Sequence, residues 1–425
     1  MASNLAALRE AIVTSNDAKF LQDVIDSDLS KAARDRLQEI SVAETAARTP
    51  AERALASIIG GFVADAAVQS VQWVYDEETI KTKLHPQSAK LPFSEQHLCP
   101  FFKVGVGEST AYGDQARAAL VAIHSAVTAD SKKGDGSQSL FDPSAYESQL
   151  VAIFGNDSAY GPWPVPKGAE DKDKFPLPHK WRNHSIKSFL GTGKPQADDH
   201  QLDSAAKVPA IVASLHGIAP EQDILNTVEK IVGVTQDSDQ AVAAATIAAD
   251  VLAALLKGLR TKDALAAALD TNSAEQVGER VAEREDSEAT AAMRKLIAEA
   301  LEAWRNQASE SPTPFVDFAL KNGIGCRIPG SIINALAVFS ESGDLGYEQT
   351  VQRAISCGGD VVSRSIVSGA LAAAVNGVAS IPTEWIKKTK GLADVVKLAR
   401  DILSKHPNAD SALKLADQLL STIEA

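Results

Sequence analysis

The stretch that decides the fold lies near the C-terminus. Residues 356–386 read Ser-Cys-Gly-Gly-Asp-Val-Val-Ser-Arg-Ser-Ile-Val-Ser-Gly-Ala-Leu-Ala-Ala-Ala-Val-Asn-Gly-Val-Ala-Ser-Ile-Pro-Thr-Glu-Trp-Ile. Two glycines and Asp360 come before a run of small residues, and the spacing Gly-x-x-x-Ile-Pro-x-x-Trp follows that run. Alanine is the strongest helix former because it loses no side-chain entropy on folding. The stretch therefore predicts a small-residue helix over 364–376, with Asp360 close to its start.

The composition is typical of a helical globular protein. The chain has 425 residues, of which 45% are hydrophobic, 23% are charged and 5% are aromatic. A chain of this length could form one large domain or two to three ordinary ones. Apolar residues recur at helical spacing, and no run of strand length alternates apolar with polar residues. We therefore predict an all-α fold.

The charge and the cysteines narrow the classes of partner. The formal net charge of −13 disfavours nonspecific binding to nucleic acid phosphates and to an anionic membrane surface. Three cysteines without metal-ligand spacing favour a reduced compartment. Residues 1–19 contain acidic side chains and no apolar run of signal-peptide length. The Ala-rich stretch 240–258 predicts a buried helix rather than a membrane span. We expect a cytoplasmic protein with neither nucleic acid nor membrane as a partner.

The helical spacing divides the chain into two segments. Residues 1–48 are predicted to form an N-terminal helical extension, and residues 49–425 the main helical domain. The main domain begins where Thr49 can cap a helix that has Pro50 in its first turn.

Within the main domain we expect a helix from Asp114 to about Thr128. A long irregular loop is predicted over 155–200, with a short helix from Trp181 to Leu190, and a Pro/Gly-rich loop over 311–330. A loop as long as 155–200 in a compact domain is usually functional or disordered.

Four sequence blocks, in this order, resemble the ADP-ribosylglycohydrolase family over roughly residues 50–390. They are Gly60-Gly61-Phe62-Val63-Ala64-Asp65-Ala66, Gly107-Glu108-Ser109-Thr110-Ala111-Tyr112-Gly113-Asp114-Gln115, His200-Gln201-Leu202-Asp203-Ser204-Ala205-Ala206-Lys207-Val208-Pro209 and residues 356–386. Two details, Gln72-Trp73-Val74-Tyr75-Asp76 and Tyr112-Gly113-Asp114-Gln115, are similar to the branch that contains the J1 crystallins of jellyfish. The resemblance implies the orthogonal helical bundle of that family.

The resemblance also implies a metal site that has lost part of its charge. Active members of the family are thought to use two Mg²⁺ ions, which position ADP-ribose and a water for cleavage of a glycosidic bond. Asp114, Asp360 and Ser363 stand at the ligand positions of the family. Gly113 and Val362 replace acidic residues there. Because Mg²⁺ prefers six hard oxygen ligands, we expect one ion or none.

Four residues are candidate ligand contacts: Asp114, Tyr112, Arg364 and Asp360. The Arg364 guanidinium could replace a metal ion as the partner of a phosphate or carboxylate. Structural alternatives remain open. The two aspartates could interact with free N–H groups at helix starts, Tyr112 could be a core residue, and Arg364 could form a salt bridge to either aspartate. Asp65, among small residues, is expected to have a structural hydrogen-bonding role. No residue is assigned as catalytic.

Three functional hypotheses follow. A divergent ADP-ribosylglycohydrolase-like protein could bind a small ligand of the ADP-ribose type and hydrolyse its glycosidic bond. A non-catalytic, crystallin-like structural protein is the alternative that Gly113 and Val362 favour. The third is an enzyme of this fold with a different small polar substrate, since fold does not fix function. An open cleft at Asp114 and Asp360 would support ligand binding, and a cleft filled by Val362 and Tyr112 a structural role. The oligomeric state stays open.

Overall fold

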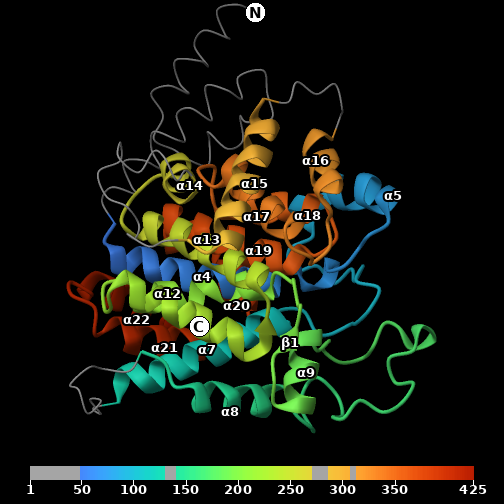
Figure 1. The fold of residues 1–425 in the computed structure, drawn as a ribbon, viewed down its shortest axis with the longest axis horizontal. Helices are drawn as coiled ribbons and strands as arrows, with labels where there is room; N and C mark the ends of the chain where they lie inside the picture. Colours follow the sequence, from blue (N-terminus) through green and yellow to red (C-terminus); the bar gives the residue numbers. More distant parts are fainter. Residues whose placement is uncertain (1–47, 130–139, 270–285, 307–312) are drawn as a thin grey trace, which may run out of the picture.

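The computed structural model describes residues 48–129, 140–269, 286–306 and 313–425. These residues form a bundle of α-helices, which confirms the predicted all-α class (Figure 1). The predicted extension over 1–48 lies outside the described residues, except for Arg48. Two strands of two residues each, β1 (Gln196–Ala197) and β2 (Gln236–Asp237), pair in parallel. The longer helices are α4 (Pro50–Val68), α7 (Ala111–Thr128), α8 (Pro143–Phe154), α9 (His184–Thr192), α11 (Val208–Leu215), α12 (Glu221–Thr235), α13 (Asp239–Leu256), α14 (Thr261–Leu269), α15 (Glu288–Arg305), α16 (Pro314–Asn322), α17 (Gly330–Ser342), α18 (Tyr347–Ser356), α19 (Val361–Asn376), α21 (Leu392–Leu403) and α22 (Asp410–Glu424).

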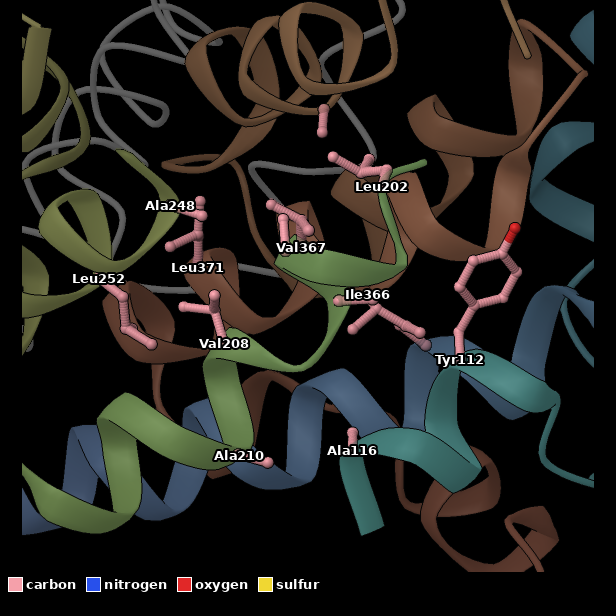
Figure 2. Packing of buried hydrophobic residues seen from close by; sticks show 14 of the residues in the cluster. Tyr112, Ala116, Leu202, Val208, Ala210, Ala248, Leu252, Ile366, Val367 and Leu371 are labelled. Atoms are coloured by element: carbon pink, nitrogen blue, oxygen red, sulfur yellow. The ribbon is translucent and has the colours of Figure 1, made fainter. Parts of the chain in front are cut away.

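The centre of the bundle is a close contact between α4 and α19, which the other helices surround (Figure 1). Small residues make this contact possible. A Cβ atom added at Gly60 would lie 2.5 Å from the Cβ of Ala373 and 3.2 Å from the carbonyl oxygen of Gly369. Larger apolar side chains fill the next layer, where Ile366, Val367 and Leu371 of α19 pack with residues of α11 and α13 (Figure 2). Alanine and glycine therefore set the spacing of the core.

Two buried helices are long and apolar enough to cross a membrane by length and composition alone. They are Pro50–Val71, which includes α4, and α13. The apolar window is fully buried in the first and 83% buried in the second. Core helices of large domains meet the same criterion. The prediction of a buried helix over 240–258 is confirmed.

The helix starts follow the capping chemistry of the sequence, with two shifts. The Thr49 side chain accepts from the Glu52 main chain, and the Glu52 side chain accepts from Thr49, as in a capping box. Helix α7 begins at Ala111, three residues before the predicted start, because the Thr110 hydroxyl accepts the free N–H of Tyr112. The short helix predicted from Trp181 is α9, which begins at His184.

The prediction of a loop over 311–330 is wrong in its first half. Residues from Pro314 to Asn322 form helix α16. Pro314 occupies the first turn, where its missing N–H costs nothing. Phe315 and Phe318 are buried, and their ring centroids lie 5.3 and 5.1 Å from that of Trp304 on α15. Aromatic packing between the helices therefore outweighs the local loop signal of proline and glycine.

The glycine pair at 358–359 joins three distant segments before α19 begins. Gly359 exchanges main-chain hydrogen bonds with Trp73 (2.7 Å) and Val74 (2.8 Å), and Asp360 donates to the carbonyl of Ile324 (2.7 Å). Both glycines have positive φ, at +63° and +66°, and a Cβ on Gly359 would lie 2.0 Å from the Ile324 carbonyl oxygen. Only glycine fits this crossing. The junction fixes the position of the Asp360 carboxylate.

Candidate functional site

Asp114 lies in the first turn of α7 and is enclosed by three hydrogen-bond donors. Ser109 Oγ donates to Oδ1 at 2.7 Å. Tyr160 donates to Oδ2 at 2.7 Å, and the Lys180 ammonium donates to the same oxygen at 3.0 Å. The Lys180 side chain is only 9% exposed and also donates to Ser109 Oγ at 2.9 Å. A buried cation of the chain itself therefore neutralises the carboxylate predicted to bind metal.

Asp65 of α4 fills the space beside this group. Its two carboxylate oxygens accept from the main-chain N–H of Thr110 (2.8 Å) and from its hydroxyl (2.5 Å). These bonds tie α4 to the start of α7, which is the structural role predicted for Asp65. Burial is the largest cause that raises the pKa of Asp65 to about 7. A Cβ added at Gly113 would lie 2.1 Å from Oδ2 of Asp65. The glycine that replaces a family carboxylate is thus required by the packing.

Asp360 is held at the start of α19 by two side chains. Gln72 Nε2 donates to Oδ1 at 2.6 Å, and Ser363 Oγ donates to Oδ2 at 2.5 Å. Gln72 Oε1 in turn accepts the free N–H of Val362 at 2.8 Å. Burial raises the pKa of Asp360, and the hydrogen bonds from Ser363 and Gln72 oppose that shift. Asp360 and Ser363, the two metal ligands predicted in this segment, are therefore hydrogen-bonded to each other. The side chain of Val362, between them in the sequence, is buried.

Arg364 is engaged with the main chain. It is 1% exposed, and its guanidinium donates to the carbonyl oxygens of Ala354 (3.2 and 3.1 Å) and Gly358. These contacts tie the end of α18 to the glycine junction. Among the described contacts, none is a salt bridge from Arg364 to Asp114 or Asp360, so that alternative is not what the structure forms. A ligand contact by Arg364 stays a prediction.

Tyr112 is buried beside the Asp360 group. The side chain is 2% exposed, and Figure 2 shows its hydroxyl pointing away from α7. The Cys326 thiol lies within reach of the hydroxyl, which makes no other hydrogen bond to the described part of the chain. Burial, followed by the charge of Asp360, raises the pKa of Tyr112 far above its usual range. The phenol is therefore neutral and available as a donor.

A narrow pocket is lined by one hydrogen-bond partner of each aspartate, Lys180 and Gln72. It is lined by Gln72, Trp73, Phe102, Thr110, Ala111, Tyr112, Lys180, Trp181 and Asn183. Its cavity volume is about 10 Å³, close to the space that one water occupies. Edge-to-face contacts narrow it, since the Trp73 ring centroid lies 5.8 Å from those of Phe102 and Trp181. Aromatic side chains nearly fill this pocket.

The residues present do not fit the shell of two Mg²⁺ ions. All four carboxylate oxygens of Asp114 and Asp360 already accept hydrogen bonds from side chains. The Val362 side chain offers no oxygen, and Lys180 supplies a positive charge beside Asp114. No group of three or more His, Cys, Asp or Glu side chains is placed to hold a metal ion within the residues that the structure describes. Octahedral oxygen coordination requires more free ligands than this.

A second buried polar group, not predicted from the sequence, surrounds the third block. Lys207 is fully buried and donates to Gln115 (3.1 Å) and Thr235 (2.9 Å). Asp203 accepts from Ser185 at 2.8 Å. Burial and the neighbouring Asp203 raise the pKa of Asp199 to about 7. The group fastens α7, α9 and α12 around the segment that leads into α11.

Three residues at the site were not predicted as site residues from the sequence: Gln72, Tyr160 and Lys180. Gln72 stands just before the tight turn at Trp73. Its hydrogen-bond partner, Asp360, lies almost three hundred residues later in the chain, and the residues around Gln72 do not indicate that contact. Tyr160 and Lys180 belong to the long loop over 155–200. The length of that loop was the only signal of a role, and it does not single out one lysine among several.

Comparisons with known proteins agree with the resemblance read from the sequence. The profile of the ADP-ribosylglycohydrolase family matches residues 46–412. Crystallin J1A of Tripedalia cystophora is 26% identical over 360 residues, which cover 83% of this chain and 96% of that protein. Crystallin J1B of the same organism is 26% identical over 357 residues, with the same coverage. A solved structure described as an ADP-ribosylglycohydrolase-related protein complex covers 84% of this chain and 99% of its own, with a TM-score of 0.52 and 16% identity. The chain belongs to the ADP-ribosylglycohydrolase family.

Proposed function

We propose that this chain is a non-hydrolytic, metal-independent member of its family, with a structural role like that of its crystallin relatives. The observation that carries the proposal is the closed hydrogen bonding of Asp114 and Asp360. Every oxygen of both carboxylates accepts from a protein donor, and Lys180 provides the charge that a metal would otherwise supply. A water-sized pocket leaves no room for an ADP-ribose group.

The buried Lys180 supports metal independence on energetic grounds. A carboxylate in a site of low dielectric needs a positive partner or several donors. Asp114 has both, because Lys180, Tyr160 and Ser109 all donate to it. A Mg²⁺ ion would have to displace the ammonium and lose part of its hydration shell, which it sheds reluctantly. In this proposal the Lys180 ammonium takes the place of the metal ion beside Asp114, and the carboxylate is not a free metal ligand.

The competing proposal is that the site still binds a ligand of the ADP-ribose type and hydrolyses its glycosidic bond. Family membership and the retained Asp114, Asp360 and Ser363 favour it. It would require Trp73 or Trp181 to move, and the hydrogen bonds to the two carboxylates to open. Trp181 is partly exposed, so a movement of its ring is the simplest route.

Calorimetry with ADP-ribose, with and without Mg²⁺, separates the two proposals. We expect no binding heat in either buffer and no release of ADP-ribose from an ADP-ribosylated peptide. Micromolar binding that needs Mg²⁺ and is lost in Asp360→Ala would overturn the proposal. Asp173→Ala, at an exposed loop position, is the matched control for loss of one carboxylate. Binding without Mg²⁺ and without turnover would keep the absence of hydrolysis but replace the structural role with ligand binding.

A further inference from the structure

The pocket lined by Lys180 and Gln72 carries more hydrogen-bond donors than the protein satisfies. Trp73 Nε1 and Asn183 Nδ2 are buried without a partner in the described chain, and the Tyr112 hydroxyl has no neighbour there to bond with except the weakly polar Cys326 thiol. All three residues line the pocket, together with Lys180. They are 9%, 3% and 2% exposed. A buried donor without an acceptor is costly, because it loses its bond to water, so three at one place indicate an acceptor that belongs there.

Two acceptor oxygens in the lining are already engaged by other donors. Gln72 Oε1 already accepts from the main chain of Val362, and Thr110 Oγ already accepts from that of Tyr112. The carboxylate of Asp114 does not line this pocket and has its own three donors. The polar groups of the pocket that still lack a strong partner are therefore mainly donors. They are an indole N–H, an amide NH₂, a phenol O–H and one remaining ammonium hydrogen.

A single water molecule is a poor match for this lining. A water accepts about two hydrogen bonds, so it would leave part of this set of donors unsatisfied. A spherical anion accepts from all directions and brings no hydrogens. The cavity of about 10 Å³ admits a monatomic ion near the size of water and excludes a phosphate. The edges of aromatic rings, which carry partial positive charge, complete the wall.

We propose that this pocket binds a halide-sized anion, chloride in particular, held by Lys180, Asn183, Trp73 and Tyr112. Lys180 faces Asp114 at 3.0 Å and Glu108 at 3.8 Å, so the ammonium is largely neutralised. The N–H and O–H dipoles therefore supply most of the attraction, and we expect an affinity of roughly millimolar order. The inference goes beyond the proposed function, since a protein without hydrolase activity can bind an anion.

Chloride NMR line width on the full-length protein tests the site. The protein is prepared in sodium gluconate, and chloride is added at constant ionic strength, with bromide as a competitor. We expect saturable broadening that bromide reverses. Asn183→Asp replaces a donor with a negative charge at nearly constant shape, and should weaken binding at least tenfold. Asn408→Asp, at an exposed position, makes the same charge change and should leave binding unaltered.

A second variant distinguishes loss of the anion site from misfolding of Asn183→Asp. Tyr112→Phe removes a hydroxyl whose described neighbour is the weakly bonding Cys326 thiol, so the fold should persist, and chloride binding should still weaken severalfold. Broadening that does not saturate, or equal affinity in the wild type, Asn183→Asp and Tyr112→Phe, would overturn the proposal in favour of a bound water or a surface site. The assay contains no ADP-ribose and no Mg²⁺, so its failure leaves the proposed absence of hydrolysis untouched.

Discussion

At the scale of single residues, the start of α7 shows how a metal ligand can be lost and its loss made permanent. Gly113 has no room for a side chain, because Asp65 Oδ2 would lie 2.1 Å from an added Cβ. Asp65 is itself held by Thr110. Restoring an acidic residue at 113 alone would therefore break the contact between α4 and α7 before it could bind a metal. Asp65 and Gly113 depend on each other.

Removal of the Lys180 ammonium tests whether it replaces the metal charge. Lys180→Met would leave Asp114 buried without its cation, and we expect a loss of about 3 kcal/mol in the free energy of unfolding. Lys187→Met is the matched control. Its partner Glu170 and the lysine are each at least 20% exposed, so the expected loss is about 1 kcal/mol or less. Urea unfolding measures both. Equal losses in the two variants would show that Lys180 is an ordinary surface lysine.

At the scale of elements, the contact between α4 and α19 depends on glycine at position 60. Gly60→Ala would place a methyl group 2.5 Å from the Cβ of Ala373. We expect a net loss of roughly 1–2 kcal/mol, because overpacking outweighs the gain in helix propensity. Gly233→Ala on α12 meets no atom within 4 Å and should raise stability by up to about 1 kcal/mol. Thermal unfolding of both variants measures the difference, and a stabilised Gly60→Ala would contradict the close approach.

The helices could be predicted from the sequence where local chemistry determines them. Thr49 and Pro50 mark the start of α4, and the small residues of 364–376 mark α19. Helix α16 could not be predicted, because its Pro and Gly neighbours signal a loop and only the packing of Phe315 and Phe318 on Trp304 stabilises the helix. The same distinction between local sequence and tertiary packing holds for the residues of the candidate site. Asp114, Asp360 and Ser363 belong to sequence motifs, but Lys180 reaches Asp114 only through the tertiary fold.

At the scale of the whole molecule, a partly buried histidine is expected to make stability depend on pH. Burial, followed by the nearby charges of His406, Lys257 and Arg53, lowers the pKa of His216 from 6.5 to about 4. The unfolded chain therefore binds a proton at a higher pH than the folded chain does. The contribution of His216 to the free energy of unfolding is therefore complete above pH 6.5 and is lost as the pH falls toward 4, by roughly 3 kcal/mol in total.

Urea unfolding of His216→Gln across this pH range checks the assignment. The variant should lose less stability than the wild type between pH 6.5 and pH 4, while the exposed His184→Gln should follow the wild type. An identical pH dependence in all three proteins would show that other groups govern the acid sensitivity.

The pairing of α4 with α19 also has a consequence for how the chain folds as it is made. Helix α4 ends at Val68, and its partner begins at Val361. During synthesis from the N-terminus, the apolar faces of α4 must wait for almost the entire chain to leave the ribosome, and long-range contacts of this kind are slow to form. A nascent chain that stops before residue 376 would expose the future core to solvent. The central contact of the bundle can therefore form only after α19 has been made.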